Sequence, residues 1–254
     1  MIEKRNIIVR NLNIRYLRSR DIGGKGVLLF LHGWGSCAEH FGSVLEKRGN
    51  FVAVDLPGFG GSEIPPVPWL LDDYVSFVKA FLGAVGVENP VIAGHSFGGS
   101  IGIRYCVQGN PCEKLILIGS AGIRKKSARK RTLFLAAKIF GSIFSVPGLR
   151  FLKDRLRKRF YTSVVGSDDY LTAGKMVDTY RNVIGEDLSE DMKRIVVPTT
   201  LIWGERDADT PLEDARIMER SVAGSELRVI PGAGHYVFLD DPVGFESVFL
   251  SVSR

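Results

Sequence analysis

The feature that most constrains this chain is a serine between two glycines, where an apolar run meets a helix-compatible segment. The apolar residues 91–93 are followed by residues 94–98, which read Gly-His-Ser-Phe-Gly and lead into a segment that favours a helix. A strand, a sharp turn and a helix in this order hold a serine hydroxyl at the tip of a sheet, and the glycines are needed because a Cβ would clash there. The pattern predicts Ser96 as a nucleophile if the rest of the chain supplies its partners.

Strand-like and helix-like segments alternate along the chain. Strands are predicted over residues 27–31, 51–54, 91–93, 115–118, 200–203 and 227–230. The unbroken apolar run at 27–31 is typical of a strand buried on both faces of a parallel sheet. Helices are predicted over residues 40–48, 71–85, 100–108, 212–222 and 240–252. Residues 6–18 alternate apolar and polar side chains around Asn11, which predicts an antiparallel hairpin at the edge of the sheet. This order predicts an α/β fold with a largely parallel sheet.

The alternation stops between residues 121 and 195, where the sequence is basic, apolar and helix-like. We therefore expect a core made of residues 1–120 and 196–254, with residues 121–195 inserted as a helical cap over the carboxyl edge of the sheet. The chain shows no internal repeat and no low-complexity tract.

The positive charge of the chain is concentrated in this predicted cap. Residues 123–160 contain thirteen Lys or Arg and one acid, Asp154, which gives +12; the net charge of +6 therefore leaves −6 for the remainder. The simplest interpretation is a lid helix that covers the active site. The same segment could instead contact a membrane surface or anionic lipid as a basic amphipathic helix, or hold an acidic substrate such as a coenzyme A thioester. No nucleic-acid partner is expected, because no binding fold is recognised and the remainder is acidic.

Composition indicates a soluble globular protein, with 45% hydrophobic and 24% charged residues. The amino-terminal residues lack the apolar core of a signal peptide, and no apolar run reaches the length of a membrane span. Cys37, Cys106 and Cys112 form no CxxC pair, which favours free thiols in a reducing compartment. We therefore expect a cytoplasmic protein.

A serine nucleophile needs a histidine as its base, and the chain has four histidines. His235 follows a predicted strand in a glycine-rich loop, from which its imidazole can reach over the sheet edge. His95 would point away from its neighbour Ser96, His32 is placed to hold the loop after a strand, and His40 opens a surface helix. His235 is therefore the predicted base.

The acid that orients this base should lie between the serine and His235 in chain order. Three carboxylates, those of Glu205, Asp207 and Asp209, follow the predicted strand 200–203. Asp209 is next to a helix start and could be its N-cap, whereas Glu205 lies close to the strand. Asp207 is therefore the predicted acid.

The tetrahedral intermediate of acyl transfer carries an oxyanion, which backbone N–H groups stabilise. One predicted donor is the amide of Phe97, the residue after the nucleophile. The second is the amide of Trp34, because Gly33 lets the chain turn after the strand 27–31. Both roles belong to the main chain, which leaves the two aromatic side chains free to line the pocket.

Four motifs in one order make the chain resemble the α/β-hydrolase superfamily over residues 25–120 and 198–254. They are His32-Gly33-Trp34-Gly35, the glycine-rich loop 55–62, the serine motif 94–99, and Trp203-Gly204 to Pro211 followed by Gly232-Ala233-Gly234-His235. The resemblance implies an eight-stranded, mostly parallel sheet, the triad Ser96–Asp207–His235 and a lid after the strand 115–118. It implies neither a metal nor a nucleotide cofactor. The glycines at 58–61 lack the spacing of a phosphate-binding loop.

A serine rather than a carboxylate at the nucleophile position implies acyl transfer to water through an acyl-enzyme. The expected function is a carboxylesterase that acts on small or medium acyl esters, with a small-molecule ester as its partner. The alternatives are a lipase or acylglycerol hydrolase at a membrane surface, a C–C bond hydrolase, and, from another class, a ligand receptor that retains the triad without turnover.

Overall fold

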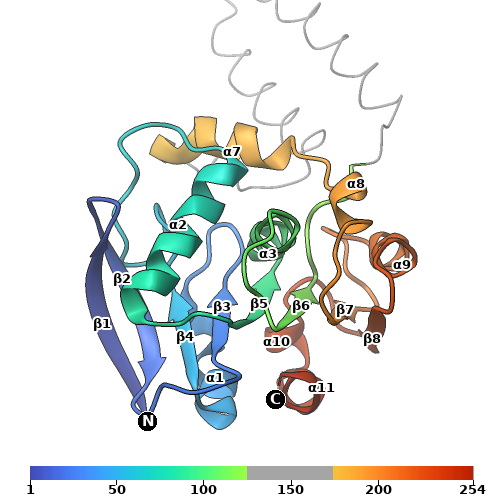
Figure 1. Cartoon of the computed structure of the whole chain (residues 1–254). Helices are drawn as coiled ribbons and strands as arrows, with labels where there is room; N and C mark the ends of the chain where they lie inside the picture. Colours follow the sequence, from blue (N-terminus) through green and yellow to red (C-terminus); the bar gives the residue numbers. More distant parts are fainter. Residues whose placement is uncertain (125–173, 254) are drawn as a thin grey trace, which may run out of the picture. The chain divides into compact units, whose positions relative to one another are not determined.

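The computed structural model describes residues 1–124 and 174–253, which contain one eight-stranded sheet (Figure 1). The strands lie in the spatial order β1-β2-β4-β3-β5-β6-β7-β8. Only the pairs β1–β2 and β2–β4 are antiparallel, so the predicted mostly parallel sheet is confirmed. The strands are β1 (Ile2–Val9), β2 (Leu12–Ser19), β3 (Leu28–Leu31), β4 (Phe51–Val54), β5 (Val91–His95), β6 (Lys114–Ile118), β7 (Thr199–Gly204) and β8 (Glu226–Ile230).

The hairpin predicted around Asn11 is formed by β1 and β2, which pair along their whole length. Arg10 and Asn11 both have a positive φ, of 51° and 63°. Two consecutive residues in this region make a two-residue turn whose twist matches that of the flanking strands. The hairpin forms one edge of the sheet.

Helices cover both faces of the sheet (Figure 1). In β3, Leu29 and Leu31 point into one hydrophobic cluster, whereas Leu28 and Phe30 point into the other, because successive side chains of a strand face opposite ways. The first cluster includes side chains of α2 (Leu71–Val85), α3 (Phe97–Val107) and α9 (Leu212–Ser221). The second includes side chains of α1 (Gly42–Arg48), α10 (Val237–Asp240) and α11 (Pro242–Val252).

Two predicted helices begin later than expected, because a separate short helical segment precedes each of them. Residues Ala38–Phe41 form a 3-10 turn, and the α-helix expected from residue 40 begins only at Gly42. The helix expected over 240–252 begins at Pro242, where Asp241 caps it by accepting a hydrogen bond from the Gly244 amide at 3.0 Å. Proline suits the first position of a helix, because its missing N–H would have no partner there.

From Lys175 on, the described end of the predicted cap is part of the sheet-containing unit. It comprises the 3-10 turn Gly174–Met176, α7 (Val177–Ile184) and α8 (Ser189–Met192). The Trp69 amide donates to Thr179 Oγ1 at 3.0 Å, and Asn182 Nδ2 donates to the Trp69 carbonyl at 3.1 Å. Met1–Ile123 and Lys175–Arg254 form one compact unit, which includes residues 175–195. The rest of the predicted cap, including its basic segment from residue 125 to residue 159, lies outside the described residues.

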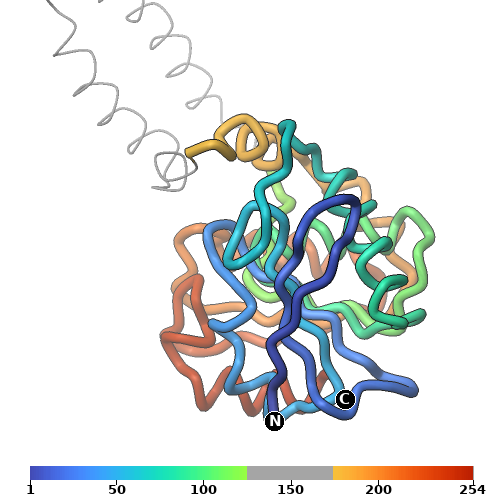
Figure 2. The backbone as a smooth tube through the Cα atoms, turned by 90° about the vertical axis from the view of Figure 1, so that its left-hand side faces the viewer, coloured from blue at the N-terminus to red at the C-terminus, as the bar shows by residue number. Residues whose placement is uncertain are grey.

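In this unit α7 lies at the opposite end from both chain termini (Figures 1 and 2). Among the helices of residues 1–124 and 174–253, none combines the length and the apolar character needed to cross a bilayer.

Candidate active site

The turn between β5 and α3 holds Ser96 in a strained conformation, with φ 50° and ψ −112°. A Cβ on Gly94 would overlap the Gly98 carbonyl, and a Cβ on Gly98 would overlap the Leu31 carbonyl. Both glycines of the motif are therefore required by close backbone approach, as the sequence pattern predicted. Ser96 is partly exposed although its neighbours are buried.

Hydrogen bonds from the neighbouring strand and its loop hold the strained residue. The Ser96 amide donates to the Ile118 carbonyl at 2.9 Å, and the Ala121 amide donates to the Ser96 carbonyl at 3.1 Å. A strained residue persists only where its surroundings over-determine it, and these bonds from both sides of the peptide supply that constraint.

Asp207 and His235 come together at the same edge of the sheet, after β7 and β8. Asp207 Oδ2 lies 2.9 Å from His235 Nδ1, and the two side chains are 0% and 9% exposed. Asp207 Oδ1 accepts hydrogen bonds from the amides of Asp209 and Thr210, at 2.9 and 2.8 Å. The carboxylate predicted as the acid is thus the one that contacts the predicted base.

The two other candidate carboxylates have different surroundings. Asp209 is exposed, and the helix that follows begins at Leu212 after Pro211, so the interpretation of Asp209 as an N-cap is wrong. Glu205 Oε2 accepts a hydrogen bond from the Gly232 amide at 2.8 Å. Glu205 therefore supports the loop that carries the histidine.

Two further contacts support the His235 loop and were not anticipated. Asp240 Oδ2 accepts a hydrogen bond from the Gly234 amide at 2.7 Å. His95 Nε2 donates to the His235 carbonyl at 3.1 Å, and the two imidazole rings lie 4.9 Å apart. His95, the residue before the serine, thus links the end of β5 to the histidine loop. Among the described residues, no hydrogen bond joins the Ser96 hydroxyl to the His235 ring; in unliganded sites such a contact is often long and tightens when substrate binds.

Two buried histidines serve the framework as neutral rings. His32 Nδ1 donates to the Gly33 carbonyl at 2.7 Å, while its Nε2 accepts from the Leu56 amide at 2.9 Å, so His32 holds the following loop as expected. Burial lowers the pKa of His32 to about 4 and that of His95 to about 3. Both rings are uncharged at neutral pH.

These two histidines should make the protein sensitive to mild acid. The unfolded chain takes up a proton at each ring below pH 6.5, whereas the folded rings stay neutral down to about pH 4 and about pH 3. Their contribution to stability is fully present above pH 6.5 and is lost as the pH falls. From pH 8 to pH 5 the free energy of unfolding should fall by about 4 kcal/mol, about 2 kcal/mol per ring. Urea unfolding at pH 8, 6.5 and 5 measures this; equal stability at all three would refute it.

The peptide between Gly33 and Trp34 directs the Trp34 N–H, one of the two predicted oxyanion donors, away from the loop. The Gly33 carbonyl accepts hydrogen bonds from His32 Nδ1 and from the Ser36 amide at 3.2 Å. Because a trans peptide is planar, the Trp34 N–H of the same peptide points the opposite way. A Cβ on Gly33 would lie 3.2 Å from Ser96 Cβ, so this peptide is next to the serine.

The other predicted donor, the amide of Phe97, is the first N–H of α3 and has no partner within the helix. Among the described residues, neither this amide nor that of Trp34 donates a hydrogen bond. Two unpaired N–H groups beside a serine can stabilise an anionic oxygen.

Aromatic side chains surround these amides. The Trp34 ring lies 4.7 Å from Phe59, 5.6 Å from Phe97 and 5.0 Å from Tyr180, measured between centroids. Tyr180 comes from α7, so the segment after residue 174 contributes to this cluster. The aromatic cluster (Trp34, Phe59, Phe97 and Tyr180) provides apolar surroundings beside the serine.

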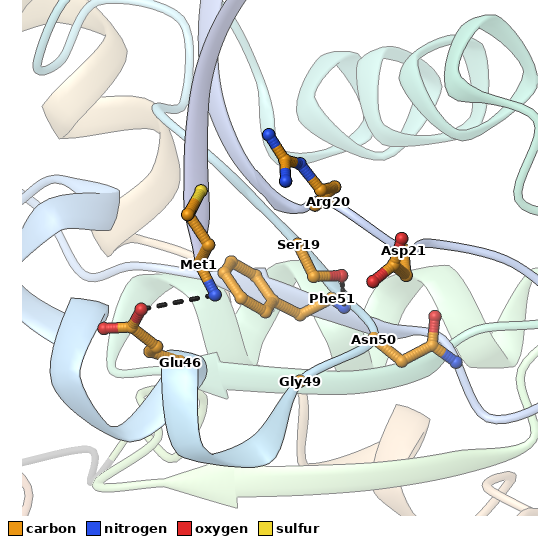
Figure 3. A pocket seen from close by; sticks show the side chains of 8 residues that line it. All are labelled: Met1, Ser19, Arg20, Asp21, Glu46, Gly49, Asn50 and Phe51. Carbon is orange, nitrogen blue, oxygen red and sulfur yellow. Dashed lines mark hydrogen bonds and ion pairs between the residues drawn. The ribbon is translucent and has the colours of Figure 1, made fainter.

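A separate pocket of about 430 Å³ lies at the amino end of β4, away from the carboxyl edge that carries Ser96 (Figure 3). At this pocket the Met1 ammonium lies 3.3 Å from the Glu46 carboxylate, and the Phe51 amide donates to Ser19 Oγ at 3.0 Å (Figure 3). The full lining is Met1, Ser19, Arg20, Asp21, Glu46, Gly49, Asn50 and Phe51.

In the described parts of the chain, His, Cys, Asp and Glu side chains form no group of three that could hold a metal ion. The three cysteines are free.

Comparison with known proteins relates this arrangement to one family. The model of the alpha/beta hydrolase family matches residues 28–248. The AB hydrolase superfamily protein YisY of Bacillus subtilis is 29% identical, over 92% of this chain and 94% of its own length. The monoacylglycerol lipase abhd6-A of Xenopus laevis is 25% identical, over 91% of this chain and 76% of its own. The solved structure of an esterase from Exiguobacterium antarcticum superimposes with a TM-score of 0.70 at 22% identity, covering 98% of each chain.

Proposed function

Because the chain belongs to the alpha/beta hydrolase family, we propose that this hydrolase is a carboxylesterase that cleaves small or medium acyl esters through an acyl-enzyme on Ser96. The observation that carries the proposal is the 2.9 Å contact between Asp207 and His235, at the sheet edge where the strained Ser96 also lies. This edge combines a nucleophile position with a histidine that a buried carboxylate orients.

In the proposed reaction, Ser96 Oγ attacks the ester carbonyl carbon while His235 Nε2 takes the hydroxyl proton. Asp207 keeps the proton of His235 on Nδ1 and stabilises the imidazolium. The amides of Trp34 and Phe97 bind the oxyanion. The imidazolium then protonates the departing alcohol, and water attacks the acyl-enzyme by the same route to release the acid. Each step uses side chains and amides of this chain, and we propose no metal or cofactor.

The aromatic cluster favours an apolar group beside the scissile bond. Aromatic rings contribute large contact areas to ligand sites, whereas the few polar groups fix orientation. The ring of Trp34 extends from the same residue whose amide is proposed to bind the oxyanion. An acyl chain held against this cluster would place its carbonyl next to Ser96.

A second candidate is an acylglycerol hydrolase or lipase that acts at a membrane surface. Its support is the named activity of the abhd6-A relative and the thirteen basic residues between positions 123 and 160. We propose membrane contact through this basic segment only as part of the alternative. For the esterase we propose a small-molecule ester as the substrate and the cytoplasm as the location.

Turnover of p-nitrophenyl esters with acyl chains from two to sixteen carbons tests the proposal, with and without anionic vesicles and with Ser96→Ala as the blank. We expect Ser96-dependent turnover that is greatest with short or medium chains and that vesicles do not change. A long-chain optimum raised by vesicles would favour the lipase. No turnover with any ester would reject the esterase and leave a C–C bond hydrolase or a non-catalytic receptor.

A further inference from the structure

The hydroxyl of Thr210 touches the oxygen of Asp207 that faces His235. We propose that Thr210 is a positioning residue, which holds the Asp207 carboxylate in line with the imidazole of the base. This inference rests on the proposed function, because it assigns a role within the same site. Thr210 lies three residues after Asp207, in the loop between β7 and α9.

Three distances define the contact. Thr210 Oγ1 lies 2.8 Å from Asp207 Oδ2, and Asp207 Oδ2 lies 2.9 Å from His235 Nδ1. Thr210 Oγ1 also lies 3.3 Å from His235 Nδ1, which closes a triangle of three polar atoms. The threonine hydroxyl therefore donates to the same carboxylate oxygen that accepts the imidazole N–H.

The backbone around Thr210 is anchored at a second point. Trp203 Nε1 donates to the Thr210 carbonyl at 2.6 Å, and the Trp203 side chain is completely buried. The Gly119 carbonyl lies 3.1 Å from Thr210 Oγ1 and offers the hydroxyl an alternative acceptor after β6. The hydroxyl is thus held by parts of the chain that lie far apart in sequence.

The consequence for Asp207 is that both of its oxygens are fixed. Oδ1 accepts two amide N–H groups, and Oδ2 accepts the threonine hydroxyl in addition to the imidazole. Rotation of the carboxylate would break these bonds together. When His235 takes the serine proton on Nε2, its Nδ1–H remains directed at Oδ2, and Thr210 supplies a neutral donor that does not compete for that proton.

A purely structural role for Thr210 predicts a different result. If its hydroxyl only joined the β6 and β7 loops through Gly119, its removal would lower stability and leave the chemical step unchanged. Thr199 in β7 is a suitable control, because its Oγ1 donates to the Val197 carbonyl at 2.9 Å and the residue is 5% exposed. Thr199→Val removes a buried hydroxyl from the same strand system without touching Asp207.

The experiment compares Thr210→Val, Thr210→Ser and Thr199→Val in the full-length protein, on the best ester of the series. Thr210→Val, which replaces the hydroxyl by a methyl group, should lower kcat about tenfold with KM unchanged, the effect of one neutral hydrogen bond. Thr210→Ser keeps the hydroxyl and should stay within about twofold of the wild type, and Thr199→Val should keep the wild-type kcat. Thermal unfolding of all three reports any loss of fold.

A second readout needs no substrate. The low-field proton signal of the His235 ring N–H, identified by its absence from His235→Ala, should shift in Thr210→Val and be retained in Thr210→Ser. Wild-type kcat in Thr210→Val, or an equal loss in both Thr210 variants, would overturn the inference. Absence of Ser96-dependent turnover in the wild type would instead reject the proposed function, and the proton signal would still decide whether Thr210 positions Asp207.

Discussion

The Ser96→Ala variant should lose ester hydrolysis by a factor on the order of 10⁵ to 10⁶ while remaining folded. Alanine removes the only atom that would form the acyl-enzyme, whereas the backbone hydrogen bonds to the Ile118 carbonyl and from the Ala121 amide do not involve the side chain. The measurement is kcat/KM on the best p-nitrophenyl ester, together with thermal unfolding. Residual activity above about one per cent would show that another residue is the nucleophile.

The same loss should follow from His235→Ala, and combining the two changes should add little. Residues that act as one unit have non-additive effects on the rate, because the first removal already disables the step that the second residue serves. If the loss of kcat/KM in the Ser96→Ala/His235→Ala double variant were the product of the losses in the two single variants, the two residues would act in separate steps. His40→Ala serves as the control, since this exposed histidine bonds to Ser36 and lies outside the proposed site.

Asp207→Asn should lower kcat by a factor on the order of 10³ to 10⁴. An amide at this position can present an N–H to His235 Nδ1, which forces the ring proton onto Nε2, where the base must be free. Asp207 is buried and bonded to His235 at 2.9 Å, so the effect acts directly on the proposed base. Steady-state kinetics across the pH range measures the loss.

The matched control is Asp209→Asn, two residues along the same loop. The Asp209 side chain is exposed, and only its amide reaches Asp207, so this change should leave kcat within about twofold. A larger loss in Asp209→Asn than in Asp207→Asn would reassign the acid. Equal and small losses in both would remove the carboxylate from the mechanism.

Most of the sheet could be predicted from the sequence because the local sequence pattern of its strands identifies them. The run at Phe51–Val54 is wholly buried, and an uninterrupted apolar pattern of that kind has few other interpretations. The location of Ser96, Asp207 and His235 at one sheet edge could also be predicted, because each residue follows a strand and parallel strands bring their carboxyl ends to one edge. Local pattern and topology together were sufficient for these residues.

The supporting contacts could not be predicted because they depend on distant parts of the chain. Nothing local to Glu205 indicates that it binds the Gly232 amide, or that Asp240 binds that of Gly234. The role proposed for Thr210 has the same character, since its side chain is defined by partners on two other loops. The packing of residues 175–195 with the sheet-containing unit likewise depends on contacts that local helix signals do not reveal.

The strained backbone of Ser96 limits how this protein can be made more stable. A residue held at φ 50° and ψ −112° costs about 1–3 kcal/mol, against a total stability of about 5–15 kcal/mol for a typical domain. Glycine at this position would relax the strain but would delete the proposed nucleophile, so evolution or engineering cannot recover this energy without losing turnover. Thermostable variants must therefore arise elsewhere, at exposed positions such as Val196 and Val243, which are 93% and 81% exposed.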